Sequence, residues 1–178
     1  EMILKGADIR KYHTTRTNNY IVFKPENFQQ VAPTEMYRSP EKLLYRFISS
    51  QLVFAYDDKQ TLSLNSCNIV IPRIPGTKIK YVLAILNSRI AQFIYKKEFN
   101  SVKVLRSHIE NIPIPTADAS TQAEIIALTD KLISGLQADE AEKVYDELDL
   151  LVSKAFHLDS NEIEIINKAV EGDNKFLA

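Results

Sequence analysis

Residues 86–115, LNSRIAQFIYKKEFNSVKVLRSHIENIPIP, decide how this chain is interpreted. Apolar residues at helical spacing predict a helix from Ser88 to Tyr95, with Ser88 as its N-cap. A segment of basic, amide and hydroxyl-bearing residues follows, and an extended Ile-Pro-Ile-Pro run closes the stretch. The polar residues of this segment are Lys96, Lys97, Asn100, Ser101, Lys103, Arg106, Ser107 and His108. Side chains of these types contact phosphates and the edges of bases, so the stretch predicts recognition of nucleic acid.

No pattern typical of catalysis accompanies this stretch. His13, His108 and His157 are far apart in the sequence, and none has a second metal ligand at helical spacing. The G-x-S-x-G, G-x-G-x-x-G and P-loop patterns are missing. The Pro-Pro pair of the Asn-Pro-Pro-Tyr motif, which holds adenine in amino-methyltransferases, is also missing. We therefore expect no catalytic residue and no metal site in this chain.

Two groups of charged residues resemble catalytic arrangements only superficially. Glu98 and Lys103 are too far apart for the Glu-x-Lys spacing of nucleases. Asp146, Glu147 and Asp149 are close together, but apolar residues alternate with them on an expected helix. We expect these three carboxylates to form a solvated helix face.

Charge divides the chain into two regions. The net charge is only -1, but residues 1–115 hold 17 Lys and Arg against 9 Asp and Glu, whereas residues 116–178 hold 5 against 14. Thirteen of the 16 Phe and Tyr residues and all seven prolines lie in the first region. This asymmetry indicates a nucleic-acid contact in the first region. We expect a recognition part (residues 1–115) followed by a helical part (residues 116–178).

The recognition part has the pattern of short strands followed by helices. The strand candidates are Tyr20–Phe23, Leu43–Ile48, Leu52–Tyr56, Thr61–Leu64 and Cys67–Ile71, with a turn at 57–60. A helix capped by Thr77 is expected next. The fold class predicted is α/β (α+β): a twisted mixed or antiparallel sheet with helices, followed by a C-terminal helical module. Cys67 is expected to be a small core residue.

The helical part shows three amphipathic patterns. A capping box of Thr121 and Glu124 opens a helix over 121–136, a second helix begins at Asp139, and a third begins at Ser160 and ends near Gly172. The wide apolar face of the first helix needs a partner. We expect the two following helices to cover it, and the alternative is an oligomer formed through helix 121–136.

The hydropathy of the chain and its first residues indicate where the protein is located and whether the sequence is a piece of a longer one. No apolar run approaches the roughly 18 residues of a membrane helix, and no signal-peptide pattern opens the chain. We expect a cytoplasmic protein without a membrane partner. Because the chain begins with Glu1 inside a patterned segment, we expect a piece of a longer protein.

The whole pattern resembles a known family. LKGADIRKY at 4–12 resembles its G-x-D-I-x-x-Y opening, and residues 43–72, LLYRFISSQLVFAYDDKQTLSLNSCNIVIP, resemble its strand pair. Residues 86–115 followed by QAEIIALTDKLI, and VYDELDLLVSKAFHLDSNEIEII at 144–166, fit the rest. The match is to the TaqI-like C-terminal specificity domain of adenine-specific DNA methyltransferases and combined type IIG restriction enzymes. The chain is also similar to half of a type I restriction specificity subunit.

The resemblance implies a role in bacterial restriction-modification. The domain would read a short sequence in the major groove of double-stranded DNA and place a catalytic domain over a target adenine. That methyltransferase domain would lie N-terminal in the parent chain and bind S-adenosylmethionine, so no cofactor is expected here. Residues 100–106 and Arg46 correspond to the family position by position.

Individual DNA contacts follow as hypotheses. Lys96, Lys97, Lys103 and Arg106 would contact phosphates or guanines, while Asn100, Ser101 and His108 would contact base edges or backbone. Arg46, on its strand, and Arg38, in the loop before Pro40, complete the set. The alternative for each is a surface charge or turn residue, and Lys96 and Lys97 are also favoured by a helix C-terminus.

Two other functions stay open. The first is half of a type I specificity subunit, which would work with separate methyltransferase and translocase chains. The second is a protein-interaction domain whose basic face meets an acidic protein, which predicts no DNA binding at physiological salt.

Overall fold

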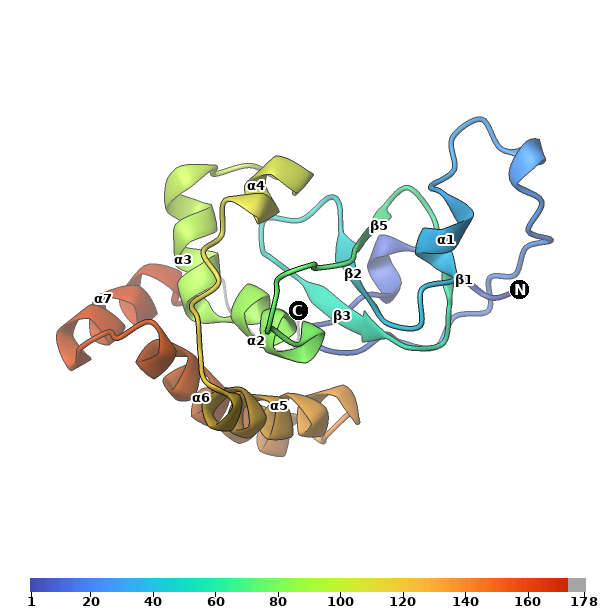
Figure 1. Ribbon diagram of the computed structural model, residues 1–178. Coiled ribbons are helices and arrows are strands. Elements are labelled where there is room, and N and C mark those ends of the chain that lie inside the picture. Colours follow the sequence, from blue (N-terminus) through green and yellow to red (C-terminus); the bar gives the residue numbers. More distant parts are fainter. Residues whose placement is uncertain (173–178) are drawn as a thin grey trace.

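Five short strands make two small sheets in the part of the chain that the structure, a computed structural model, describes: residues 1–172 (Figure 1). In the antiparallel sheet, β2 (Lys42–Arg46) lies between β3 (Phe54–Asp57) and β5 (Cys67–Val70). In the other sheet, β1 (Ile3–Leu4) pairs in parallel with β4 (Leu62–Ser63). With the helices that follow, these sheets confirm the predicted mixed class with a helical C-terminal part.

The strand expected at Tyr20–Phe23 is wrong. The segment is a loop in which Tyr20 makes a single bridge to Met2, and a short 3-10 helix, η2 (Pro25–Asn27), follows it. Ile21 and Phe23 do pack inward, while Tyr20 and Val22 are more than two-thirds exposed. The alternation is therefore real, and the N-terminal residues lie beside it: the N–H of Ile3 donates to Asn19 and that of Ile21 donates to Glu1. In the described structure this pairing ends at Ile21, so no strand forms over residues 20–23.

The antiparallel sheet is covered by apolar residues on both faces. Leu43 and Tyr45 join the main core, whereas Leu44 and Cys67 join a second cluster with Leu4. Cys67 is buried and reduced, as predicted for a small core residue, and burial raises its thiol pKa to about 12. A buried, protonated thiol of this kind is inert.

Helices make up most of the second half of the described chain. The bounds are η1 (Gly6–Asp8), α1 (Thr34–Tyr37), α2 (Ile79–Asn87), α3 (Arg89–Glu98), α4 (Arg106–Glu110), α5 (Ala119–Ile133), α6 (Ala138–Ala155) and α7 (Ser160–Val170). Among residues 1–172, none of them combines the length and the hydropathy needed to cross a membrane.

Helix caps agree with the sequence at Ser88 and differ elsewhere. The Ser88 side chain accepts the backbone N–H of Ala91, which confirms it as the cap of α3. The cap of α2 is Lys78 and not Thr77. The cap of α5 is Asp118, whose carboxylate accepts the N–H of Thr121, so the predicted Thr121 capping box is wrong. A carboxylate is a better cap than a threonine hydroxyl, which explains the earlier start.

The helical part packs on the recognition part through a shared core. Helix α5 lies against α2 and α6, and α7 lies against α3. The main core contains Leu83 of α2, Leu132 of α5 and Val152 of α6, together with Leu43 of the sheet. The apolar face of α5 is thus covered within the chain. Of the two following helices that were expected to cover it, α6 does so, whereas α7 packs on α3 and α2 takes its place.

The opening Gly-x-Asp-Ile-x-x-Tyr motif is fixed by close contacts. A Cβ on Gly6 would lie 2.5 Å from the carbonyl oxygen of Ser66, so no larger residue fits without movement. Asp8 accepts the N–H of Lys5 at 2.8 Å. Tyr12, buried at a φ of 73°, donates its N–H to Phe54 at 2.7 Å and bridges in parallel to β3. The motif therefore joins the N-terminal segment to the antiparallel sheet.

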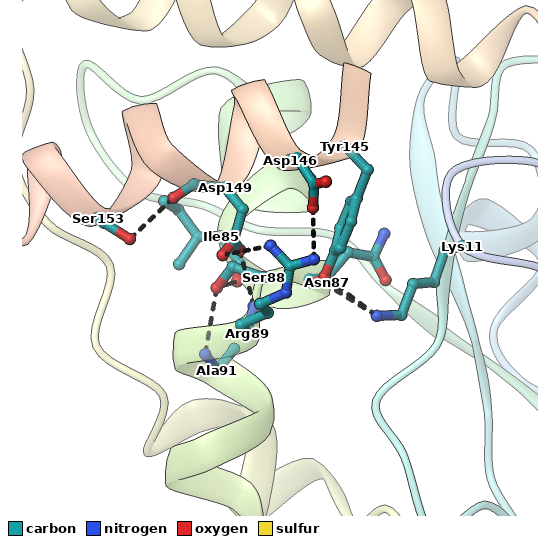
Figure 2. Close-up of polar contacts among 10 residues, drawn as sticks. All are labelled: Lys11, Ile85, Asn87, Ser88, Arg89, Ala91, Tyr145, Asp146, Asp149 and Ser153. Atoms are coloured by element: carbon teal, nitrogen blue, oxygen red, sulfur yellow. Dashed lines mark hydrogen bonds and ion pairs between the residues drawn. The ribbon is translucent and has the colours of Figure 1, made fainter. Parts of the chain in front are cut away.

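A polar junction, made of Lys11, Asn87, Arg89, Tyr145 and Asp149, holds α3 and α6 together (Figure 2). The N–H of Arg89 donates to Asp149 at 2.8 Å, and its guanidinium lies 3.4 Å from the same carboxylate. Asp149 is only 5 % exposed, and burial raises its pKa. The expectation of a solvated face is therefore wrong for Asp149. It lies between Leu148 and Val152, on the side of α6 that faces the core.

Lys11 completes the junction from the N-terminal segment. Its Nζ donates to the Asn87 carbonyl and to the Tyr145 hydroxyl, both at 3.3 Å, and that hydroxyl donates to the same carbonyl at 2.9 Å. Burial lowers the pKa of Lys11 to about 7. The N-terminal segment, the bend between α2 and α3, and helix α6 are thus tied together at one place.

Candidate nucleic-acid interface

The two lysines at the end of α3 have different surroundings. Both are exposed in the last turn of the helix, where cations are favoured by the helix dipole. Lys96 donates to the carbonyl of Ala169 on α7 at 3.1 Å, so part of its role is to tie α3 to α7. The Nζ of Lys97 lies 5.7 Å from the centroid of the Phe93 ring. Both charges remain at the surface.

A tight turn follows at Asn100 and Ser101. Asn100 is exposed, with a φ of 39°. The Ser101 hydroxyl accepts the N–H of Lys103 at 3.1 Å, and its carbonyl accepts the Tyr95 hydroxyl at 2.7 Å. Ser101 thus shapes the turn with the atoms that were expected to face DNA, whereas the amide of Asn100 projects from it.

Lys103 lies on a short two-stranded ridge. It bridges antiparallel to Ile48, and the bonds from Val104 to Phe47 (2.8 Å) and from Ser49 to Val102 (2.9 Å) flank this bridge. Val104 is buried, so the alternation of an extended segment places the Lys103 side chain outward. The ridge therefore fixes the backbone from which the exposed Lys103 side chain projects.

Arg106 is the first residue of α4, and its side chain is 85 % exposed. Its Nε donates to Glu110 at 2.6 Å, one turn further along the helix, and this contact raises the pKa of Arg106. An exposed pair of this kind contributes little to stability, so the guanidinium can exchange it for a phosphate or a guanine.

His108 is half-buried between aromatic rings. It stacks on Phe99 at a centroid distance of 4.3 Å, and its edge meets Tyr95 at 5.8 Å. Its Nδ1 accepts the N–H of Leu105 at 3.3 Å. These contacts give His108 a structural role in fixing α4. Its contact with DNA stays a prediction, and it would have to be made by Nε2.

The two remaining predicted arginines make contacts within the fold. Arg46 donates from Nε and Nη2 to the carbonyl of Ile9, at 2.9 and 2.6 Å, and so supports the opening motif. Arg38 follows α1 and donates twice to the Glu1 carboxylate, at 2.6 and 2.8 Å. Both side chains therefore have partners outside the 96–108 segment, and DNA contact by either one stays a prediction.

A groove of about 1130 Å³ lies beside α4, between the edge strand β5 and the loop that leads into α1. Its lining includes the amide side chains of Gln29, Gln30, Asn65 and Asn68, with Arg73 and Arg106. Asparagine, glutamine and arginine are the side chains that pair with adenine and guanine edges. The sequence analysis identified Arg106 but missed the others. No local pattern marks them, because three distant segments meet only in the fold.

Comparison with known families decides the identity of the domain. A family model, the TaqI-like C-terminal specificity domain, matches residues 1–114. The chain belongs to this family. No curated protein matches it in sequence. The matched residues include the opening motif, both sheets, the 96–108 segment, α4 and all the groove-lining residues.

A TaqI-like specificity domain supplies sequence-specific DNA recognition in restriction-modification systems and is not itself catalytic. DNA binding, and linkage to a methyltransferase part, follow from this membership. Within residues 1–172, no three His, Cys, Asp or Glu side chains are grouped to hold a metal ion. The exposed cations, and the largely apolar groove with its four amide side chains, are the surfaces on which recognition by this specificity domain is to be sought.

Proposed function

We propose that this domain reads a short sequence in double-stranded DNA for a site-specific adenine methyltransferase, with or without an attached endonuclease. The observation that carries the proposal is the position of Arg106: it lies 85 % exposed at the groove that four amide side chains line, within a TaqI-like specificity domain. S-adenosylmethionine would bind in the methyltransferase part of the parent protein. The bacterial cytoplasm, where such DNA lies, is the proposed place of action.

The surface supports a division of labour. Lys97 and Lys103 are exposed lysines without a carboxylate partner among the ion pairs of the described chain. Lysines of this kind contact phosphates, which provide affinity and a steep dependence on salt. Arg106 and the groove amides are suited to base edges, which provide specificity. Residues 116–178 are proposed as the module that supports α3 and docks on the catalytic part.

The test is a selection from a randomised duplex library at low and at moderate salt, followed by sequencing of the retained DNA. Enrichment of one short motif is expected. The test variant is Lys103→Ala/Arg106→Ala. Its matched control is Lys131→Ala/Lys168→Ala, which removes the same charge from α5 and α7. The first pair should lose retention and the second should keep it.

Two results would overturn the proposal. Retention without any enriched motif would leave a basic surface and no reading of sequence. Absence of retention at low salt, both for the chain and for its parent protein, would favour an acidic protein as the partner. An adenine methylated within the selected motif by the parent protein would support the finer assignment to an adenine methyltransferase.

A further inference from the structure

Exposed aliphatic side chains stand next to the cations of the ridge. Ile48 is 56 % exposed and Leu105 is 41 % exposed. The loop that carries Ile48 joins β2 to β3 and passes beside the start of α4, where Leu105 is the N-cap (Figure 1). Single exposed apolar residues are normal on protein surfaces. Two exposed apolar residues beside the same lysine, however, suggest a functional role.

Backbone geometry places these side chains on one face. The backbone bonds on either side of the bridge make Ile48 and Lys103 a non-hydrogen-bonded antiparallel pair, whose side chains project to the same side. Val104 points into the core, so Lys103 and Leu105, on either side of it in an extended segment, point outward together. Ile48, Lys103 and Leu105 thus form one surface, here called the methyl patch, with Arg106 next to it in sequence.

The chemistry of the methyl patch fits one feature of DNA. In the major groove, thymine is distinguished from the other bases by its C5-methyl group, which aliphatic side chains contact. The neighbouring Lys103 and Arg106 provide the charge that a DNA partner requires. Cations beside aliphatic side chains also suit an anionic lipid surface, and it is membership of a DNA-specificity family that favours DNA as the partner.

We propose that Ile48 and Leu105 contact thymine methyl groups in the major groove and so make at least one A·T pair part of the recognised sequence. This inference rests on the proposed function, and it adds two apolar residues to the polar DNA contacts predicted from the sequence. The ridge bonds fix the backbone beside Ile48 and Leu105 before DNA arrives, so little backbone entropy is lost when the two side chains meet the base.

The test removes only the methyl group. In the duplex selected by the chain, each thymine is replaced in turn by deoxyuridine, which pairs identically. At one position or more, the unmodified protein should bind the deoxyuridine duplex about three- to fivefold more weakly, the effect of one buried methyl group. The Ile48→Ala/Leu105→Ala variant should bind the thymine and deoxyuridine duplexes equally well.

The control is Ile165→Ala, a change of a 60 % exposed isoleucine on α7 that should preserve the thymine preference. Each part of the proposal can fail separately. A selected motif without an A·T pair, or one without a deoxyuridine effect, would overturn the inference and leave the proposed function intact. Equal weakening of both duplexes by Ile48→Ala/Leu105→Ala would indicate insertion between bases or packing on sugars, and would also overturn it. A selection without any motif would overturn the proposed function as well.

Discussion

Arg89 and Arg106 begin consecutive helices of the same family domain, and their surroundings are opposite. Arg89, with a side chain only 23 % exposed, contacts Asp146 at 2.5 Å and Asp149 at 3.4 Å. Arg106 is 85 % exposed and has Glu110 of its own helix as its ion-pair partner. Arg89 is held within the fold by its ion pairs. Arg106 would give up only one weak, exposed ion pair on binding a new partner.

The comparison teaches how the domain separates stability from recognition. The polar junction groups buried charges whose partners come from distant parts of the chain, so a loss there exposes an unpaired charge to the core. The ridge and α4 present cations that stability does not require. Substitutions in the junction should therefore change unfolding, and substitutions on the ridge should change DNA binding alone.

The largest effect is expected for Asp149→Ala. Removal of this buried carboxylate leaves the Arg89 guanidinium half-buried with one exposed partner, and leaves the N–H of Arg89 without its acceptor. Breaking a buried pair costs about 3–5 kcal/mol of the free energy of unfolding. Urea unfolding measures it. The matched control is Asp146→Ala, whose carboxylate is 56 % exposed and whose loss should cost at most about 1 kcal/mol. Equal losses of unfolding free energy in the two variants would contradict the distinction between buried and exposed partners of Arg89.

A pH dependence is expected from Lys11 in the same junction. Burial lowers its pKa from 10.5 to about 7, so above pH 7 the unfolded chain binds one more proton than the folded chain. Stability should rise with pH from 7 to 8.5, by no more than ~1.4 kcal/mol per pH unit. Below pH 7, Lys11 is charged in both states and this contribution is constant. Urea unfolding at pH 7.0 and 8.5 compares the wild type with Lys11→Met, in which the rise should disappear.

Other titrating groups set the limits of that window. Burial lowers the pKa of His13 below 6.5, so its effect lies at lower pH. Burial raises the pKa of Cys67 from 9.0 to about 12, so above pH 9 this thiol makes stability fall. A rise that persists in Lys11→Met would show that another group is responsible.

Most strands and one helix cap could be predicted from the sequence because they depend on local patterns of residues. The strands at 42–70 appear within about two residues of their predicted places, since each is a short apolar run bounded by turn residues. The cap at Ser88 was also local. The start of α5 was missed because Asp118, Ser120 and Thr121 are all suitable caps, and the choice depends on how the chain leaves Pro115.

Tertiary contacts account for what the sequence did not reveal. Asp149 and Asp146 lie on the same acidic stretch of the sequence, which does not distinguish them. The burial of Asp149 depends on its contact with Arg89, 60 residues away. Gln29 and Asn68 meet Arg106 only when three segments come together at the groove. The predicted site residues were found where they are consecutive, at 96–108, and stay predictions as DNA contacts.

A moderate effect is expected for Gly6→Ala, which tests whether the family's opening motif belongs to the stable frame. The added Cβ would lie 2.5 Å from the Ser66 carbonyl oxygen, next to the turn between β4 and β5. Overpacking of this kind costs about 1–3 kcal/mol. Thermal unfolding measures the loss, and Gly76→Ala separates steric from backbone effects, because Gly76 has a positive φ but open space around it. A loss at Gly76 alone would contradict the steric explanation.

The smallest energetic effect, and the most informative about function, is expected for Arg106→Ala. Its affinity for the selected duplex should fall at least tenfold, as expected for the loss of a guanine contact, while the urea midpoint stays close to that of the wild type. Lys97→Ala should instead weaken binding to all sequences alike and reduce the salt slope by about one. Titrations at several salt concentrations, on the selected duplex and on a scrambled one, separate these two behaviours. If Arg106→Ala weakens both duplexes equally, Arg106 contacts phosphate, and base reading must then be assigned to the groove amides, starting with Asn68. If its affinity is unchanged while Asp149→Ala abolishes binding in the folded state, the division between a stable frame and a reading surface is wrong.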